Sequence, residues 1–170
     1  MVKVARPPLA LQAIYLRNTA TSMAAAFRPN FPGGDLAPMF RTEHESRIEC
    51  NTTTLRTDDG AEQKALWCSF STEFEFIYVR PKEDGKLPSD SELEAHRLAR
   101  VFAEITAAYT VNSEEFPPQD VLKRWGQHNA LLHTWPYWRE FCHGALLRMG
   151  LPVTMIPLIQ IEPSSEEASQ

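Results

Sequence analysis

The chain has 170 residues, of which 43% are hydrophobic and 23% are charged, a composition typical of a folded globular protein. This length is enough to bury one sizeable core, so we expect a single domain. The formal net charge of -5 and the lack of a stripe of lysines and arginines argue against a nucleic-acid partner. No apolar run approaches the length of about 18 residues that a membrane-spanning helix needs, which argues against membrane insertion.

The three cysteines are widely spaced and contain no CxxC pair. This pattern predicts reduced thiols in a cytoplasmic protein, without a zinc or redox site. The N-terminal residues also lack the long apolar stretch and the cleavage site of a signal peptide. The cysteines are Cys50, Cys68 and Cys142.

The first strand is predicted within residues 9–27, which lie between prolines. Successive side chains of a strand point to opposite faces, and here both faces carry apolar residues. Such a strand is either covered on two sides or located at an interface. The residues concerned are Leu11, Ala13 and Tyr15 on one face, and Ile14 and Leu16 on the other.

Two further regions alternate with the period of a strand. Residues 39–57 predict one or two strands with an exposed polar face, and Asp59-Gly60 favours a hairpin turn after them. Residues 65–79 form the clearest strand. Because the successive strands are joined by short turns, we expect an antiparallel sheet. Its apolar face carries Leu66, Cys68, Phe70, Phe74, Phe76 and Tyr78, and its polar face carries Ser69, Ser71, Glu73 and Glu75.

Residues 91–110 are predicted to form a helix. Ser91 and Glu94 have the spacing of a capping box at its start. The apolar residues that follow fall on one helical stripe, which would face the core. They are Leu98, Val101, Phe102, Ile105 and Tyr109.

A shorter helical stretch, residues 120–132, leads into an aromatic helix within TWPYWREFCHGALLRMGLP, residues 134–152. We expect Pro136 in the first turn of this helix and Gly150 at a left-handed C-cap. One face forms a core stripe, while the other keeps Tyr137, Gly144 and Leu147 among charged residues, so the helix has apolar surface on two sides. The stripe comprises Trp138, Phe141, Cys142, Ala145, Leu146 and Met149.

The C-terminal part of the chain is apolar and contains Pro157, which predicts an edge strand or an extended flap. We assign residues 1–162 to one domain and residues 163–170 to a disordered acidic tail. The sequence contains no internal repeat.

No motif predicts an enzyme, a metal or a cofactor. His44 lies between Glu43 and Glu45, but on a strand the two carboxylates point away from the histidine, which favours a solvated strand face over a metal site. Neighbouring residues on a helix point about 100° apart, so Cys142 and His143 do not form a nucleophile and base pair. Phosphate-binding, GxSxG and HExxH motifs are absent from the sequence.

The tryptophans differ in their predicted roles. Trp138 begins the buried stripe, so core packing is the favoured interpretation. Trp67 lies on the polar face of the clearest strand, where a large apolar side chain indicates either contact with a partner or cover by a loop. The sequence leaves these two alternatives equally open.

The segment WPYWRE resembles the SecB-type export chaperones. Pro136, Tyr137, Arg139 and Glu140 stand as in the aromatic-Pro-Tyr-x-Arg-Glu segment of that family, and the similarity continues into Leu151-Pro152. Ile14-Tyr15 and residues 65–68 are also similar to the family's first and last sheet strands.

This resemblance implies an α+β fold, in which a four-stranded antiparallel sheet is backed by helices and the long C-terminal helix precedes an extended apolar segment. It also implies dimers that pair into a homotetramer, and ATP-independent holding of unfolded polypeptides in apolar grooves, with no cofactor or metal. By this resemblance, the client-binding residues are Trp67, Trp125, Leu131, Leu132, Trp135, Tyr137, Met155, Ile156 and Leu158. The oligomer interface comprises Cys68, Phe70, Thr72 and Leu147.

The chain departs from the export chaperones in two respects. Asn18, Ser22 and Ser69 stand where the family has carboxylates that dock the SecA motor, and Trp67 replaces an aliphatic contact, which argues against SecA docking. The predicted helix at 91–110 is similar to insertions in SecB-like chaperones dedicated to toxin–antitoxin systems. We therefore favour a holdase for a specialised client, such as an antitoxin or a secretory preprotein, and the alternative is an oligomeric scaffold without general client binding.

Overall fold

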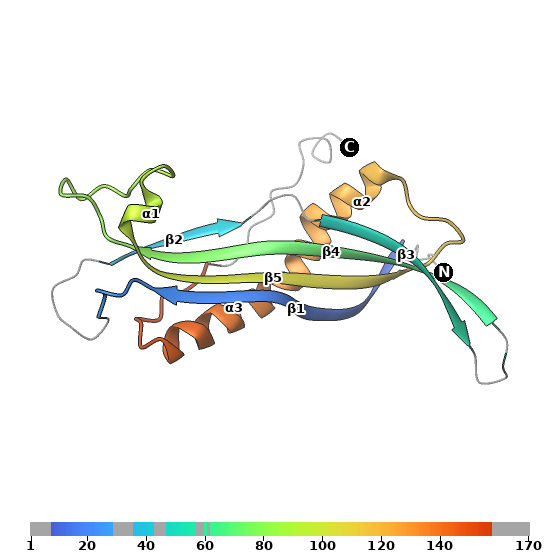
Figure 1. Ribbon diagram of the computed structural model, residues 1–170. Helices are drawn as coiled ribbons and strands as arrows, with labels where there is room; N and C mark the ends of the chain where they lie inside the picture. The colour runs from blue at the N-terminus through green and yellow to red at the C-terminus, as the bar shows by residue number, and fades with distance from the viewer. Residues whose placement is uncertain (1–7, 29–35, 43–46, 57–59, 61, 158–170) are drawn as a thin grey trace, which may run out of the picture.

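The computed structural model describes residues 8–28, 36–42, 47–56, 60 and 62–157 (Figure 1). Its strands form one antiparallel sheet in the order β1-β5-β4-β2, and β3 also pairs with β4. The sheet has five strands and not the four expected, although it is four strands wide because β2 and β3 pair with successive parts of β4. The strands are β1 (Leu9–Met23), β2 (Ala37–Thr42), β3 (Arg47–Arg56), β4 (Glu62–Val79) and β5 (Arg97–Val111).

The long C-terminal helix lies across one face of the sheet, which confirms the predicted α+β fold (Figure 1). It is preceded by a shorter helix and a π-helical turn that lead directly into it. None of the helices in the described ranges has the length and apolar character needed to cross a membrane. The helical elements are α1 (Leu93–His96), α2 (Gln119–Trp125), η1 (Gly126–Ala130) and α3 (Leu131–Arg148).

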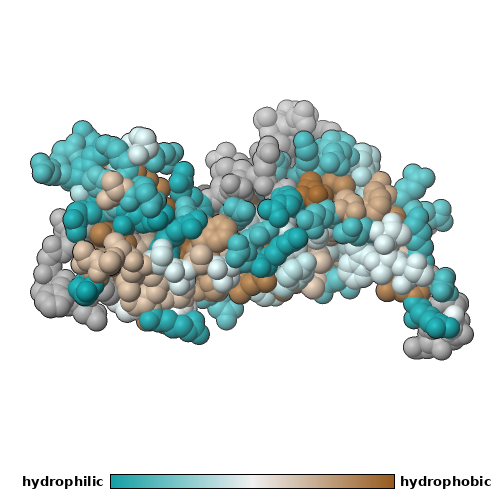
Figure 2. All heavy atoms as spheres, in the orientation of Figure 1, coloured by the Kyte–Doolittle hydropathy of each residue, from teal (hydrophilic) through white to brown (hydrophobic). Residues whose placement is uncertain are grey.

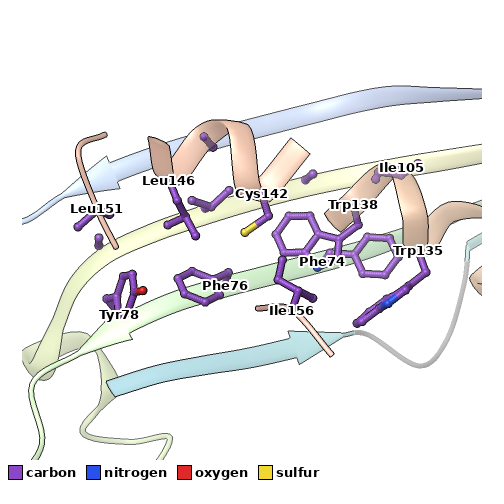
Figure 3. Close-up of a cluster of buried hydrophobic side chains, with 14 residues drawn as sticks. Phe74, Phe76, Tyr78, Ile105, Trp135, Trp138, Cys142, Leu146, Leu151 and Ile156 are labelled. Carbon is purple, nitrogen blue, oxygen red and sulfur yellow. The ribbon is translucent and has the colours of Figure 1, made fainter. Parts of the chain in front are cut away.

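The main core lies between α3 and the sheet. Alternate side chains of β4 form one wall of this core. Phe74, Phe76 and Tyr78 point toward the helix, as the sequence predicts, and each is at most 2% exposed. Trp138 lies over them, stacked on Phe74 with 5.5 Å between ring centroids. Figure 3 shows Trp138, Cys142 and Leu146 above these aromatic rings. The predicted stripe of α3 is therefore confirmed.

A second cluster lies where η1 and α2 pack near the other end of the sheet. Tyr109 is at its centre and makes edge contacts with Phe70 and Trp125, at centroid distances of 5.5 and 5.9 Å. A hydrogen bond of 2.7 Å joins Tyr109 Oη to His133 Nδ1. This contact ties the start of α3 to the central strand β5.

The prediction of a helix at residues 91–110 is wrong, because only residues 93–96 are helical and residues 97–111 form strand β5. The residues of the predicted stripe divide between the two faces of the sheet: Val101, Ile105 and Tyr109 face α3, whereas Leu98 and Phe102 face away. Since β5 is central, it is apolar on both faces, and this pattern does not distinguish a buried strand from a buried helix.

Three predictions that depended on this helix are also wrong. The capping contact forms between Ser89 and Glu92, where the Ser89 backbone N–H donates to Glu92 Oε2 at 2.9 Å. Residues 91–110 are not an insertion, because they supply the centre of the sheet. Residues 65–68 are not in the last strand, because β5 follows β4, so Trp67 and Ser69 do not align with that family's last strand. The argument against SecA docking from these two positions fails.

The two ends of the aromatic helix differ in how well they were predicted. Pro136 is not in the first turn, because α3 begins at Leu131 and continues from η1. Gly150 adopts the predicted left-handed conformation, with φ +69°. The Gly150 N–H donates to Leu147 O and the Leu151 N–H donates to Leu146 O, at 3.1 and 3.0 Å, which is the Schellman pattern.

Strand β1 lies at the edge of the sheet and pairs with β5. Irregularities between Leu11 and Ala13 and between Leu16 and Asn18 shift the alternation, so Leu11 faces α3 whereas Tyr15 faces away. Most of β1 is exposed in the described part of the chain, so the strand is not covered on two sides. The alternative, that β1 lies at an interface, stays a prediction.

Replacement of Trp138 tests the importance of the helix–sheet core. Trp138→Ala leaves a large cavity over Phe74, so we expect the free energy of unfolding to fall by about 3–5 kcal/mol in urea denaturation. Tyr137→Ala is the matched control, because Tyr137 is the preceding residue of α3 but is 49% exposed. The control is expected to lose about 1 kcal/mol or less, and equal losses in the two variants would contradict this packing.

Candidate functional site

The outward side of α3 carries large apolar side chains. Leu132, Tyr137 and Leu147 are 46%, 49% and 59% exposed. The buried stripe accounts for the other aromatic residues of the helix, so these three are not needed for the core. Aromatic and aliphatic side chains exposed in this way are available for contact with another chain.

The segment that follows α3, residues 151–157, runs back over the same face of the sheet. Leu151 and Ile156 are each 4% exposed and belong to the main core. Between these two anchors, Val153 and Met155 are exposed, and the side chain of Met155 shows 85% of its surface. The segment forms no strand, and it therefore corresponds to the extended flap that Pro157 predicts.

Hydrogen bonds from the core fix this segment at both ends. The Tyr78 hydroxyl donates to Pro152 O at 2.7 Å, and Thr154 Oγ1 lies 2.5 Å from the same hydroxyl oxygen. Trp135 Nε1 donates to Pro157 O at 3.1 Å. Tyr78 and Trp135 therefore use their apolar rings for the core and their polar atoms to position the segment.

An open pocket of about 350 Å³ lies between α3 and this segment. Its helical wall is polar and its other wall is mainly apolar, so it offers hydrogen-bonding groups beside a hydrophobic surface. This is the arrangement that recognises an apolar side chain together with a polar backbone. The pocket is lined by Arg139, Glu140, His143, Val153, Thr154, Met155 and Ile156.

The residues predicted to bind a client occupy different environments. Leu132, Tyr137 and Met155 are exposed around α3, Leu131 is half-buried, and Trp135 and Ile156 are buried in the core. Trp125, the last residue of α2, is half-buried against Tyr109. Leu158 lies outside the described residues. Of the residues predicted at an oligomer interface, Cys68, Phe70 and Thr72 are buried within the chain, whereas Leu147 is exposed.

Trp67 does not lie with the other candidate residues. It pairs with Asn51 of β3 and Thr110 of β5, and it points to the sheet face opposite α3. Its side chain is half-buried there. Among the described residues, the structure therefore places the other predicted client-binding residues on the α3 side of the sheet and Trp67 on the outer face.

The sequence-based prediction missed the polar wall of the pocket. Arg139 and His143 are four residues apart, so they lie on the same side of α3 as Leu132 and Leu147. This spacing was visible in the sequence. Their position beside Val153 and Thr154 was not, because it depends on the path of the chain after Gly150.

The outer face of the sheet is dominated by charged residues at its middle. Glu73 and Glu104 lie directly opposite each other, and Arg47 approaches both carboxylates, at 3.9 and 3.3 Å. Nearby, the hydrogen bond to Glu49 raises the pKa of Arg17. Figure 2 shows hydrophilic side chains across this part of the molecule. The outer face is therefore chemically distinct from the apolar surface around α3.

The described residues bring together no set of three or more histidine, cysteine, aspartate or glutamate side chains that could hold a metal. His44, with Glu43 and Glu45, lies outside those residues. Cys142 is fully buried, and burial raises the pKa of its thiol to about 12, whereas His143 is exposed. The two adjacent side chains therefore occupy different environments and do not form a catalytic pair.

No protein-family model matches the chain, and no curated protein matches its sequence. Among solved structures, the chain is similar to the SecB-like chaperone Rv1957 of Mycobacterium tuberculosis, in complex with a ChAD peptide from the HigA1 antitoxin Rv1956. The TM-score is 0.64 at 13% sequence identity, and the match covers 92% of this chain and 94% of that chain. The chain has a SecB-like fold.

This similarity confirms the resemblance that the WPYWRE segment indicates. In this SecB-like fold, Trp135 and Trp138 fill the core while Tyr137 points outward, so the motif combines helix packing with an exposed aromatic ring. The segment after Gly150 lies on the same side of the sheet as α3, and its residues Leu151 and Ile156 share the core with the buried side of that helix. We refer below to the exposed side chains of Leu132 and Tyr137 on α3, those of Val153 and Met155 after it, and the pocket between α3 and that segment together as the α3 surface.

Removal of the Tyr78 hydroxyl tests how the segment after α3 is held. Tyr78→Phe keeps the buried ring but loses the hydrogen bonds to Pro152 and Thr154, so we expect the amides of residues 153–156 to exchange with solvent faster. The free energy of unfolding should fall by about 1–2 kcal/mol. Tyr137→Phe is the control and should change neither quantity. Unchanged exchange at 153–156 in Tyr78→Phe would show that the segment is held by other contacts.

Proposed function

We propose that the protein is an ATP-independent chaperone that holds an unfolded or partly folded segment of a polypeptide client on the α3 surface. The observation that carries the proposal is the group of exposed apolar side chains that the core does not need, within a SecB-like fold. The similar solved structure is that of a chaperone, not of an enzyme. No nucleotide, metal or catalytic residue is part of the proposal.

The α3 surface fits an extended chain better than a folded partner. Val153 and Met155 are both exposed and lie two residues apart in an extended segment, so their side chains can contact alternate side chains of an extended peptide. Each half-exposed apolar side chain contributes about 1 kcal/mol when the client covers it. Several such contacts are needed for useful affinity, because a factor of ten requires about 1.4 kcal/mol.

We infer a specialised client, such as an antitoxin, and keep a secretory preprotein as the other candidate. The similar solved chaperone is bound to a peptide from an antitoxin, which supports the first. On β1, Asn18 and Ser22 still stand where the resemblance implies carboxylates for the SecA motor. The spacing of the cysteines favours the cytoplasm as the location of this activity.

We also propose a homotetramer formed as a dimer of dimers. Support comes from β1, which exposes Leu11, Tyr15 and Leu16 at the sheet edge, and from Leu147 on α3. An exposed edge strand of this length invites pairing with another chain unless it is covered. A tetramer would cover part of this surface and leave the rest for the client.

An aggregation assay tests client binding directly. A chemically denatured model protein is diluted into buffer without nucleotide, and its light scattering is followed with and without the chaperone. We expect suppression of scattering by the wild-type protein. The triple variant Leu132→Ser, Tyr137→Ser, Met155→Ser should bind the client roughly 100-fold more weakly, since three contacts of about 1 kcal/mol are lost.

The matched control carries three serines at exposed apolar positions elsewhere in the chain: Leu55→Ser, Leu87→Ser and Phe116→Ser. This control should suppress scattering like the wild type. Equal loss in both triple variants would refute the α3 surface as the binding site. A stable wild-type oligomer that leaves scattering unchanged would favour the alternative function, an interaction scaffold of the same fold.

The oligomeric state is measured separately by size-exclusion chromatography with multi-angle light scattering. We expect about four times the chain mass of 19.3 kDa. Leu147→Asp places a charge in the proposed interface and should lower the mass to that of a smaller species. Leu87→Asp, at a similarly exposed leucine, serves as the control and should keep the wild-type mass. A monomeric wild-type protein would contradict the tetramer.

A further inference from the structure

Two of the three cysteines face each other across neighbouring strands. Cys50 of β3 lies directly opposite Cys68 of β4 in the antiparallel register, and their Sγ atoms are 3.0 Å apart. Cys50 is exposed, whereas Cys68 is fully buried. Both thiols are free in this structure, and neither has a role in the proposed chaperone activity.

The backbone at these positions suits a disulfide bond. Directly opposed residues of antiparallel strands have Cα atoms about 4.5 or 5.5 Å apart, depending on the type of pair. Both separations lie within the range of about 4.4–6.8 Å that disulfides span. The two side chains already point to the same face of the sheet, with their sulfurs in contact. Bond formation therefore requires small side-chain rotations and no change of strand register.

We propose that Cys50 and Cys68 form a reversible intramolecular disulfide when the protein meets a peroxide, and that this bond locks the edge strand β3 onto β4. The pair is then a site of oxidative modification within the sheet. It acts independently of the α3 surface, so failure of the client-binding proposal leaves it unaffected.

The reaction proceeds in two balanced steps. In the first, the Cys50 sulfur attacks one oxygen of hydrogen peroxide, the O–O bond breaks, and Cys50 becomes a sulfenic acid as water leaves. In the second, the Cys68 sulfur attacks the Cys50 sulfur, the S–S bond forms and the S–O bond breaks. The Cys68 proton leaves with the hydroxyl group as a second water. Two thiols and one peroxide thus give one disulfide and two waters.

Accessibility determines the order of these steps. Burial, together with the hydrogen bond to Cys50, raises the pKa of Cys68 to about 12, so Cys68 stays protonated near neutral pH and is shielded from solvent. Cys50 is exposed and therefore meets the oxidant first. Burial raises the pKa of Cys142 in the same way, and Cys142 packs under α3 in a different cluster. Cys142 therefore provides an internal control for buried thiols.

The crosslink would act on a strand at the edge of the sheet. Most side chains of β3 are exposed, and in the described residues its backbone pairs with β4 alone. Such an edge strand opens more easily than the centre of the sheet. A bond between residues 50 and 68 limits this opening because β3 then remains covalently attached to its partner.

The experiment uses the full chain, treated with hydrogen peroxide at neutral pH and analysed by mass spectrometry. We expect the intact mass to fall by two hydrogen atoms, and tryptic digestion to give residues 48–56 linked to residues 65–82. Dithiothreitol should reverse the change. Cys142→Ser should form the same crosslink, whereas Cys50→Ser should not form it.

Three outcomes would refute a disulfide between Cys50 and Cys68. They are an unchanged mass, addition of oxygen to Cys50 without a linked peptide, and only intermolecular disulfides through Cys50. The effect on β3 is measured by amide hydrogen exchange of residues 48–56 in oxidised and reduced wild-type protein. We expect exchange at least tenfold slower after oxidation. Equal exchange in the two forms would refute the locking of β3, and the comparison needs no variant that risks misfolding.

Discussion

The structure depends on the packing of one helix against the apolar face that β4 and β5 share. The stack of Trp138 on Phe74 lies at the middle of this contact, and Cys142 and Leu146 continue it along the helix. Interiors are packed like crystals, so a helix seated by such rings has a fixed rotation about its axis. This rotation places Tyr137 and Leu147 in solvent. Their exposure is thus a consequence of how the core is filled.

The same core determines the path of the chain after the helix. The left-handed conformation of Gly150 ends α3 and turns the chain back over the sheet, where Leu151 and Ile156 enter the core. With both ends of the segment fixed, most of the residues between them stay exposed, and Met155 is presented outward. An exposed apolar side chain on a flexible loop would be costly to order on binding. Here the cost is reduced because Tyr78 and Trp135 already hold the segment in place.

The sequence predicts a strand well when only one face of that strand is buried. Strand β4 has one apolar and one polar face, so its alternation identified both its type and its orientation. Strand β5 is buried on both faces, and its apolar residues therefore matched a helix equally well. Within the site, Tyr137 and Leu147 were recognised on α3 itself. The alternation of β4 also placed Trp67 on the polar face, away from these residues, and only the resemblance grouped it with them.

The position of β3 shows how the two faces of the sheet act together. On the outer face, Arg47 of β3 reaches across β4 to Glu104 of β5, whose carboxylate is nearly buried beside Glu73. Exposed ion pairs contribute little, but two carboxylates side by side are unfavourable without a cation, so Arg47 favours the observed register. On the inner face, the same register brings the sulfur of Cys50 against that of Cys68. A shift by one residue would point these side chains to opposite faces and separate both contacts. The charged network on one side and the paired thiols on the other therefore depend on the same alignment of β3 with β4.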